Sequence, residues 1–577
     1  MYEGSPGQAS IRSRLGSSLL LLILCATLFL PGISTVPPTD RDESRYAEAT
    51  RQMVASGDYV RPRFQDQDQF QKPIGAFWAQ SIALLATGET REIWPYRLPS
   101  VLGATAAVFL TAWIGGELFG GAIAILGAVL LASSALLVAL AHAATTDAIL
   151  LAALVGAQAC LAKIYVGAAR GEAVSRWYAC GFWIAQGVAI LIKGPVAPLI
   201  SGLTVAALAL SDRWQKSSPE SQAVVNVRWA RELRISWAPL LTVAVAAPWF
   251  IAIGFAAGGE FFREFAVRDM LPKLRGSFES HGAPPGYYLA LALFTFWPGS
   301  IFLVGAVRDS LRRASEPAIR FCLAWLIPAW LVIELIPTKL PHYVLPLYPA
   351  LALIVARFAT YPISSPIPAT SRLIATVLAR TNLVLWAIVS MVGGAVIVAA
   401  PIVLGSGWIL ISTIAAIIAA AVAIGASVFA WRGRLTTSAW AAVAASIILM
   451  TPTFAIVIPS LDALWLSRDA SVAISAHRGE RLDQRPVAAL GYSEPSLVFT
   501  EGGAIRLIAE PGQAVGFLTD HPDGLLLVSS RRLEAFEQAA RAAAIRVNFI
   551  WLVDGINYSK GRRERLILFE RSDRALR

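Results

Sequence analysis

Charged residues are scarce in this sequence. They make up 15% of its 577 residues, whereas 56% are hydrophobic. A soluble protein carries about 25% charged residues, so this composition excludes an ordinary soluble domain. Apolar runs of roughly 20 residues recur along the chain, and each is long enough to cross a hydrocarbon core of about 30 Å. The sequence therefore predicts an α-helical polytopic membrane protein.

Cysteine is also scarce, and phosphate-binding glycine loops are absent. The four cysteines all lie in apolar segments, at Cys25, Cys160, Cys180 and Cys322. This placement argues against a disulfide framework and against a cysteine-based metal site. The chain has no Walker-type loop, no low-complexity tract and no internal repeat. A lipid-linked sugar transporter, the alternative from another functional class, would carry inverted repeats, so their absence argues against it.

The first apolar run predicts a membrane anchor. It covers Leu15–Ile33 and follows Arg12 and Arg14. A signal peptide begins in the same way, but no small-residue cleavage site follows the run, so we expect an uncleaved span with its N-terminus inside. The fifth and sixth predicted spans meet at Gly194-Pro195. They form either two separate spans or one bent pair. Hydropathy predicts about thirteen spans, the others near residues 95–119, 121–140, 147–166, 178–194, 196–210, 236–256, 286–306, 319–336, 343–360, 381–401, 407–430 and 437–458.

The positions of the basic residues predict the orientation. A net charge of +11 would suit a nucleic-acid-binding protein, but cytoplasmic loops of membrane proteins also carry an excess of Lys and Arg. Here the basic residues follow each even-numbered span, so residues 34–94 are predicted to lie outside and nucleic acid is not an expected partner. The basic residues are Lys163, Arg170 and Arg176, then Arg213, Lys216, Arg228, Arg231 and Arg234, then Arg308, Arg312, Arg313 and Arg320, then Arg372 and Arg380, and finally Arg432 and Arg434.

The composition changes after Pro459. Residues 1–459 form the predicted transmembrane domain, and residues 460–577 contain no further span. Short β-branched runs in this tail alternate with a helix expected around Arg531–Ala544, which is typical of a small α/β domain. An odd number of spans places this domain outside. The runs are Pro486–Gly491, Gly524–Val528, Val547–Val553 and Arg565–Phe569.

The loop of residues 34–94 is the predicted catalytic loop. Thr39 and Asp42 have the spacing of a capping box, and Tyr46, Ala49 and Met53 make an apolar helical stripe. Asp42, Arg45 and Tyr46 fall at i, i+3 and i+4, so they share one helix face. Asp42 is either a simple helix cap or a carboxylate base that takes a proton from an acceptor hydroxyl.

Other outside loops hold further candidates for the same site. Asp147 begins a predicted span, where it is either a helix cap or a second functional carboxylate. Lys72 and Lys193 either extend along the membrane surface or supply a fixed cation, and a lysine is a sound partner for a phosphate. Ionisable groups that gather at one membrane face are candidates for a common site. The remaining candidates are Asp269, Lys273, His281, Lys339, His342 and Tyr343.

Seven strings carry a family resemblance. In order they are DESRYAEATRQMVASGDYVRPRF, QKPIGAFW, YRLPSVLGA, TTDAILLAA, LIKGP, SHGAPPGYYL and KLPHYVLPLYPALAL, from Asp42 to Leu353. Together they are specific, although any one alone would be weak. The sequence resembles bacterial 4-amino-4-deoxy-L-arabinose transferase and related glycosyltransferases of the protein O-mannosyltransferase superfamily.

The resemblance implies a GT-C fold with juxtamembrane helices in the first periplasmic loop. It implies an inverting glycosyltransferase of the bacterial inner membrane that takes a sugar from a polyprenyl-phosphate-linked donor. The expected acceptor is a cell-envelope glycolipid or glycan at the periplasmic face, such as lipid A or the lipopolysaccharide core. Transfer to Ser or Thr of a protein is the alternative. Such an enzyme needs no nucleotide sugar, which agrees with the missing nucleotide-binding motif.

The resemblance also assigns roles to individual residues. It implies that Asp42 and Asp147 are catalytic, and that Lys273 supplies a second phosphate-binding cation. His281 lies near the implied site without an assigned role. The family carries a glutamate before the motif lysine and uses it with a histidine to bind a metal; Gln71 stands there in this chain, which makes a divalent cofactor doubtful and leaves Asp269 as the candidate ligand. The implied substrate-binding residues are Arg45, Tyr46, Lys72, Lys273, His281 and Tyr343.

Overall fold

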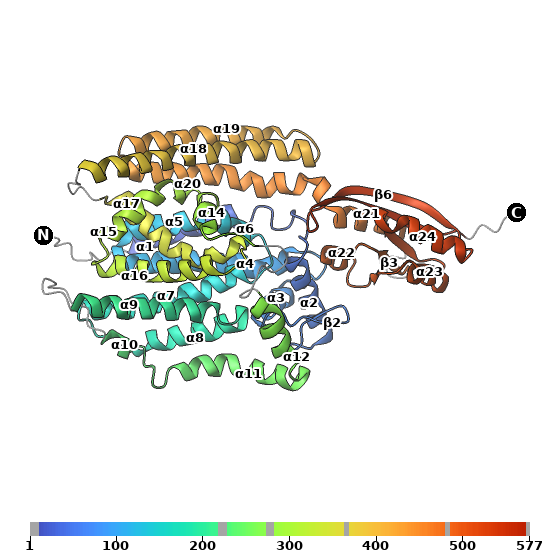
Figure 1. The fold of residues 1–577 in the computed structure, drawn as a ribbon, viewed down its shortest axis with the longest axis horizontal. Coiled ribbons are helices and arrows are strands. Elements are labelled where there is room, and N and C mark those ends of the chain that lie inside the picture. Colours follow the sequence, from blue (N-terminus) through green and yellow to red (C-terminus); the bar gives the residue numbers. More distant parts are fainter. Residues whose placement is uncertain (1–10, 217–227, 273–281, 363–368, 479–484, 573–577) are drawn as a thin grey trace.

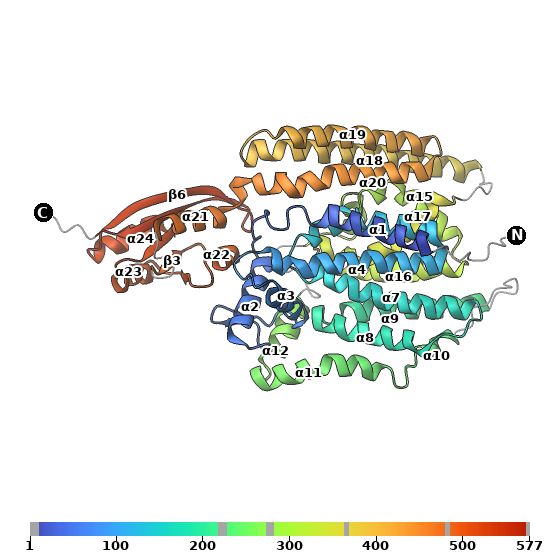
Figure 2. The ribbon, with the colours of Figure 1, turned by 180° about the vertical axis from the view of Figure 1, so that it is seen from behind.

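A computed structural model of the chain describes residues 11–216, 228–272, 282–362, 369–478 and 485–572. Most of it is a bundle of long helices, and a smaller domain with a β-sheet extends from one end of that bundle (Figure 1). The view from behind shows the same arrangement (Figure 2). The bundle therefore has two distinct ends, one of which carries the sheet domain.

The helices follow the apolar runs because a backbone in hydrocarbon must satisfy its polar groups internally. The chain leaves the bundle after α20 and enters the sheet domain. The helices of the bundle are α1 (Ile11–Phe29), α4 (Trp94–Phe119), α5 (Gly121–Ala132), α6 (Ala135–Ala141), α7 (Asp147–Ala169), α8 (Arg176–Lys193), α9 (Val196–Lys216), α10 (Trp229–Glu232), α11 (Pro239–Ala257), α12 (Glu260–Phe262), η1 (Arg263–Met270), α14 (Tyr287–Thr295), η3 (Gly299–Phe302), α15 (Leu303–Arg312), α16 (Pro317–Leu335), η4 (Pro341–Leu347), α17 (Tyr348–Thr360), α18 (Ala369–Leu404), α19 (Leu410–Trp431) and α20 (Leu435–Pro452).

The number of membrane spans differs from the number of helices. Among the described residues, 9 helices are long and apolar enough to cross a membrane, or 10 if the pair α5 and α6, bent by 61°, forms one span. The runs near residues 15–33 and 178–194 form α1 and α8, which are not among these 9 helices, and the run near 286–306 is broken into α14, η3 and α15. The polytopic helical architecture is confirmed, whereas the count of thirteen stays a prediction. α8 and α9 are separate helices, joined at Gly194-Pro195.

The loop between α1 and α4 contains two helices, α2 (Asp42–Ser56) and α3 (Gly75–Thr87), as the resemblance implied. A short hairpin of β1 (Arg63–Phe64) and β2 (Gln67–Asp68) lies between them. The predicted stripe of Tyr46, Ala49 and Met53 is buried, and the Tyr46 ring meets Phe77 of α3 edge-on, with 5.4 Å between centroids. α2 thus packs its apolar face on α3.

The sheet domain is built on five strands in the order β4-β3-β5-β7-β6. β3 pairs in parallel with β4 and β5, and β7 pairs antiparallel with β5 and β6. The four predicted strands and the long helix are confirmed, while β4 and three helices were not predicted. The elements are α21 (Leu466–Arg478), β3 (Val487–Leu490), α22 (Pro495–Thr500), β4 (Arg506–Ile508), α23 (Pro511–Asp520), β5 (Leu525–Ser529), α24 (Ser530–Ala542), β6 (Val547–Asn557) and β7 (Arg562–Arg571).

Helices cover both faces of this sheet. Side chains alternate along a strand, so Val487 and Ala489 pack on α21 and α22 while Ala488 and Leu490 pack on α23 and α24. A strand buried on both faces is continuously apolar, which explains why β3 and β5 are buried at every position.

Candidate active site

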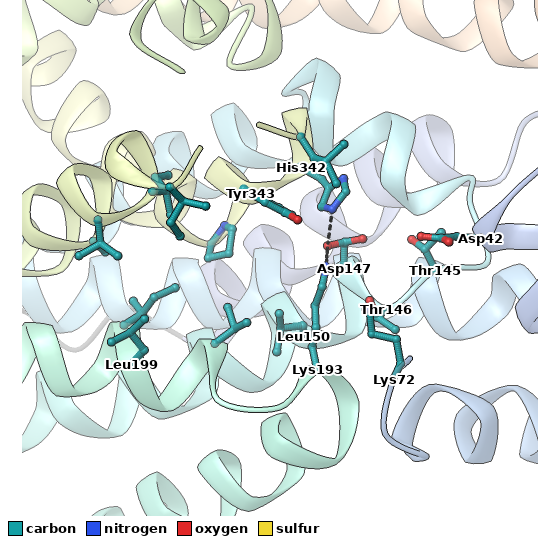
Figure 3. Close-up of a pocket in the computed structure, with 18 of the residues that line it drawn as sticks. Asp42, Lys72, Thr145, Thr146, Asp147, Leu150, Lys193, Leu199, His342 and Tyr343 are labelled. Carbon is teal, nitrogen blue, oxygen red and sulfur yellow. Dashed lines mark hydrogen bonds and ion pairs between the residues drawn. The ribbon is translucent and has the colours of Figure 1, made fainter. Parts of the chain in front are cut away.

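A cavity of about 230 Å³ lies at the end of the bundle that carries α2, α3 and the sheet domain (Figures 1 and 3). Its polar lining comes from five separate parts of the chain: α2, the turn before α3, the start of α7, the end of α8, and η4. The structure thus brings together seven of the candidates that the sequence offered. They are Asp42, Tyr46, Lys72, Asp147, Lys193, His342 and Tyr343.

Asp147 is the centre of the charged groups in this cavity. Its Oδ1 lies 2.5 Å from the Lys193 Nζ and 4.0 Å from the His342 Nε2 (Figure 3). The side chains of Asp147 and Lys193 are 11% and 14% exposed. Their short distance and low exposure make this a partly desolvated ion pair, in which each charge fixes the position of the other.

The turn after Lys193 keeps that lysine in place. Gly194 has φ 66°, a conformation that favours glycine, and a Cβ there would lie 2.8 Å from the ring of Phe265. Phe265 belongs to η1 and also lines the cavity. α8 therefore ends at the cavity wall, with Lys193 directed toward Asp147 rather than along the membrane surface.

Asp42 faces the cavity from the first turn of α2 and is exposed (Figure 3). The two capping alternatives are not supported, because the cap positions of α2 and α7 are Arg41 and Thr146, and neither helix has a side-chain cap hydrogen bond. The predicted capping box is wrong for the same reason: Thr39 donates to Glu43, through its backbone N–H and its hydroxyl. Neither Asp42 nor Asp147 therefore serves as a helix cap, and both line the cavity.

Two predicted residues, Arg45 and Lys339, lie outside the cavity lining, and three others have side chains that the structure does not describe. Arg45 is half-buried on α2, outside the lining. Lys273 and His281 lie outside the described residues, and for Asp269 the structure describes only the backbone, within η1. Among the described residues, no three His, Cys, Asp or Glu side chains are grouped so that they could hold a metal ion. The proposed second cation and metal ligand therefore stay predictions.

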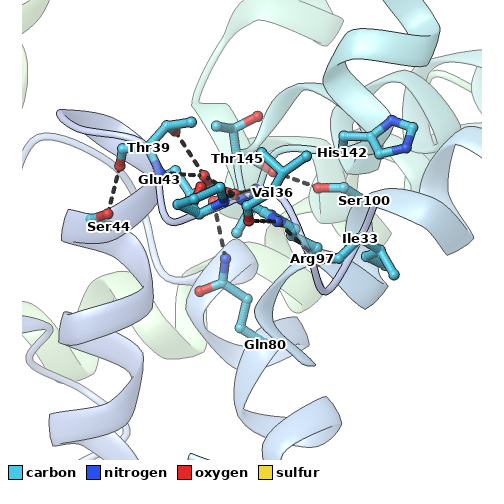
Figure 4. A network of polar contacts seen from close by, with 12 residues as sticks. Ile33, Val36, Thr39, Glu43, Ser44, Gln80, Arg97, Ser100, His142 and Thr145 are labelled. Atoms are coloured by element: carbon cyan, nitrogen blue, oxygen red, sulfur yellow. Dashed lines mark hydrogen bonds and ion pairs between the residues drawn. The ribbon is translucent and has the colours of Figure 1, made fainter. Parts of the chain in front are cut away.

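A buried ion pair lies directly behind Asp42. Arg97 of α4 and Glu43 of α2 are 0% and 1% exposed, and two parallel hydrogen bonds join them, from Nε to Oε1 at 2.8 Å and from Nη2 to Oε2 at 3.0 Å. The remaining Arg97 N–H groups donate to the carbonyl oxygens of Ile33, Val36 and Pro37 (Figure 4). A buried charge pair is stable only when its hydrogen bonds are satisfied in this way.

The same network reaches the residues before Asp147. The Ala144 N–H donates to Glu43 Oε1 at 2.8 Å, Gln80 Nε2 donates to the Ala144 carbonyl, and the Ser100 hydroxyl donates to the Thr145 carbonyl (Figure 4). Burial opposes ionisation of Glu43, but Arg97 and Thr39 outweigh it and hold the pKa of its carboxyl below the ordinary value. One ionised side chain therefore ties the segment of Asp42 to the segment of Asp147.

Sequence reasoning gave no role to Glu43 and did not single out Arg97. The usable signal was an arginine within an apolar span, since such a charge is expensive unless paired. The partner could not be predicted, because 54 residues separate the two in the chain.

Comparisons with known proteins bear on the fold of the chain. A family model described as dolichyl-phosphate-mannose-protein mannosyltransferase matches residues 17–258. The undecaprenyl phosphate-alpha-4-amino-4-deoxy-L-arabinose arabinosyl transferase of Enterobacter sp. (strain 638) is 26% identical over 356 residues. ArnT from Cupriavidus metallidurans, solved bound to undecaprenyl phosphate, superposes with a TM-score of 0.70 and 18% identity over 97% of this chain and 98% of that chain. The chain has the GT-C fold.

The GT-C resemblance expected from the motifs is thereby confirmed. The Enterobacter match covers 60% of this chain, and the chain spans 60% of the length of that relative. The apo form of the Archaeoglobus fulgidus oligosaccharyltransferase is a more distant structural neighbour, with a TM-score of 0.50 and 12% identity over 94% of this chain and 70% of that chain. The likeness to the solved structures establishes the fold of this protein.

The sheet domain contacts the chain just before Asp42. The Asp40 N–H donates to the Tyr558 hydroxyl at 2.7 Å, and the Ser496 hydroxyl donates to the Asp40 carboxylate. Arg41 Nη2 donates to the Ser559 carbonyl at 2.7 Å. Arg41 has φ 67°, an uncommon conformation for a residue other than glycine. These contacts hold the uncommon conformation that directs the chain into α2.

We expect the contribution of the buried Asp40 carboxyl to the free energy of unfolding to fall as the pH rises. Burial raises the pKa of the Asp40 carboxyl to about 6, although the hydrogen bond from Ser496 partly offsets that effect. Because this pKa is higher when folded than when unfolded, the stabilising contribution is complete below about pH 4, falls as the pH rises to about 6, and is constant above that.

Thermal unfolding of the wild type and Asp40→Asn between pH 4 and pH 7 checks this expectation. The variant should gain stability relative to the wild type as the pH rises to about 6, since the amide loses no proton. Asp523→Asn, at an exposed position of the same domain, serves as the control. A difference between wild type and Asp40→Asn that is constant over this range would contradict the assignment.

Proposed function

We propose that this protein transfers a sugar from a polyprenyl-phosphate-linked donor to a cell-envelope acceptor, at the periplasmic face of the bacterial inner membrane. The observation that carries the proposal is the cavity in which two carboxylates, Asp42 and Asp147, meet two lysines, Lys72 and Lys193. The named relatives support it, since they are arabinosyl transferases of undecaprenyl phosphate-linked aminoarabinose. The sheet domain, at the same end of the molecule, is proposed to be periplasmic.

The apolar part of the lining suits the lipid chain of such a donor. It is formed by α7, α9 and α16, and Leu199 is half exposed at its edge. Ligand sites are mostly apolar with a few placed polar groups, and here the polar groups all lie toward α2. A polyprenyl chain would lie along the apolar wall with its phosphate at the lysines. The apolar lining residues of this wall are Leu150, Val196, Leu199, Ile200, Leu203, Ala329, Val332, Ile333 and, just after α16, Ile336; Phe265, Leu340 and Pro346 complete the apolar lining.

The polar groups divide into two chemical roles. Lys72 and Lys193 are placed to stabilise the negative charge that develops on the departing polyprenyl phosphate. Asp42 faces the cavity from α2, where it takes a proton from the acceptor hydroxyl as that oxygen attacks the anomeric carbon. Attack opposite the departing phosphate inverts that carbon. Asp147 fixes Lys193 and lies near His342, and Tyr46 and Tyr343 border the sugar.

Mass spectrometry of envelope glycolipids and glycoproteins from cells with and without this protein tests the proposal. We expect one glycolipid or glycan to lack a single sugar in cells without it. Loss of the sugar from a protein Ser or Thr would instead establish the alternative acceptor. Unchanged glycans of every kind would contradict glycosyl transfer.

Lys72→Ala is expected to weaken the binding of polyprenyl phosphate by about 10-fold or more, because a hydrogen bond to a charged group contributes about 1.5–3 kcal/mol. Binding to the purified protein can be measured by isothermal titration in detergent. Lys560→Ala, an exposed lysine on the sheet domain, is the matched control and should bind as the wild type does. Equal affinity of all three proteins would remove Lys72 from the phosphate site.

Transfer is expected to survive chelation of divalent cations. The residue before Lys72 is Gln71, and a neutral amide is a much poorer ligand for a divalent ion than the carboxylate that the family carries there. The measurement compares transfer rates before and after treatment with EDTA. A rate lost on chelation and restored by one divalent ion would show that other residues complete a metal site.

A further inference from the structure

A second pocket lies at the end of the bundle opposite the active-site cavity. It has a volume of about 280 Å³ between α15, α17, α18 and the end of α19. Figures 1 and 2 show α15 at the end of the bundle that is far from the sheet domain. Three arginines line it, Arg308, Arg312 and Arg380, together with the rings of Phe358 and Trp431. We refer to it as the arginine pocket.

The charge of the arginine pocket is strongly positive. Its lining contains three guanidinium groups and one carboxylate, Asp309, which pairs with Arg313 at 3.3 Å. Within the described ranges, no carboxylate lies at ion-pair distance from the three lining arginines. Arg380 instead stacks over Trp431, 4.5 Å from the ring centroid, a geometry that orients the guanidinium without neutralising it. Such a pocket favours a phosphate or another anion.

An apolar groove continues from the arginine pocket. It has a volume of about 660 Å³ between α14, α15 and α16, and it shares Val304, Arg308 and Arg312 with the pocket. Its other lining residues are apolar, and several face the outside of the bundle; Leu289 is 68% and Leu331 59% exposed. The cationic pocket and the apolar groove therefore adjoin each other along α15.

We propose that the arginine pocket and the apolar groove bind one anionic phospholipid of the surrounding membrane. Its phosphate contacts Arg308, Arg312 and Arg380, and an acyl chain lies in the groove. The net positive charge selects an anionic headgroup over a zwitterionic one, and the groove selects a lipid over a soluble anion. In the predicted topology this end is cytoplasmic. The site is independent of the proposed sugar transfer.

Native mass spectrometry of the detergent-purified protein, titrated with phosphatidylglycerol, tests the site. The triple variant Arg308→Gln, Arg312→Gln, Arg380→Gln should bind at least about 10-fold more weakly than the wild type, since each basic residue near a membrane surface contributes about 1 kcal/mol. The matched control is the triple variant Arg228→Gln, Arg432→Gln, Arg434→Gln, which removes three exposed arginines outside the pocket. It should bind as the wild type does.

A charge-preserving variant separates binding from folding. Arg308→Lys, Arg312→Lys, Arg380→Lys should retain most of the affinity for phosphatidylglycerol, and phosphatidylcholine should bind weakly to every variant. Equal binding by the two glutamine variants would overturn the proposal. Displacement of the lipid by soluble glycerol phosphate at comparable concentration would also overturn it, because the groove would then contribute nothing.

Discussion

Asp42→Asn is expected to lower the rate of sugar transfer by about 100- to 10,000-fold, which is the usual contribution of a positioned general base. Asparagine has nearly the same size and shape but cannot accept the proton of the acceptor hydroxyl. Asp42 is exposed at the cavity and gives α2 no cap hydrogen bond. The substitution should therefore remove chemistry without loosening the helix.

The measurement is release of polyprenyl phosphate from a labelled donor by purified protein, with thermal unfolding to confirm an intact fold. Asp66→Asn is the matched control, because Asp66 is an exposed acid of the same loop outside the cavity lining. The control should react at the wild-type rate. A wild-type rate for Asp42→Asn would show that the proton goes elsewhere, as it would if the acceptor were itself a phosphate.

Arg97→Met is expected to destabilise the protein by about 3–5 kcal/mol, the usual cost of removing one partner from a buried ion pair. Glu43 would stay buried without its counter-charge, and the carbonyl oxygens of Ile33, Val36 and Pro37 would each lose a donor. Because this network joins the segments of Asp42 and Asp147, transfer should fall as well.

Thermal or denaturant unfolding in detergent measures this effect. The matched control is Arg565→Met, which breaks the exposed pair of Arg565 and Asp554, 64% and 51% exposed. Exposed pairs contribute about 0–1 kcal/mol, so the control should change stability little. If both variants lost equally little stability, the buried network would not be what joins α2 to α4.

The bundle could largely be predicted because each helix is encoded by its own apolar run. The break between α14 and α15 could not, since residues 286–306 contain no charged residue and form one long, mainly apolar run. Strand β4 was missed because it is three residues long and partly exposed at the sheet edge. The exposed strand β6 was predicted from its β-branched residues, although it continues to Asn557.

The site could be predicted where a motif identified a residue, as for Asp42, Lys72 and Asp147. Lys193 shows the limit of that reasoning. A lysine at the end of an apolar run can extend toward water or pair with an acid, and the sequence does not distinguish these outcomes. Only the packing of α8 against α7 places Lys193 beside Asp147. The Glu43–Arg97 pair was missed for the same physical reason.

A structure of the protein with undecaprenyl phosphate, determined by electron cryomicroscopy, tests the central proposal most directly. The account predicts that the phosphate lies beside Lys72 and Lys193, with its lipid chain along α7, α9 and α16 and with Asp42 facing the space next to the phosphate. A phosphate bound only elsewhere, such as in the arginine pocket, would contradict it.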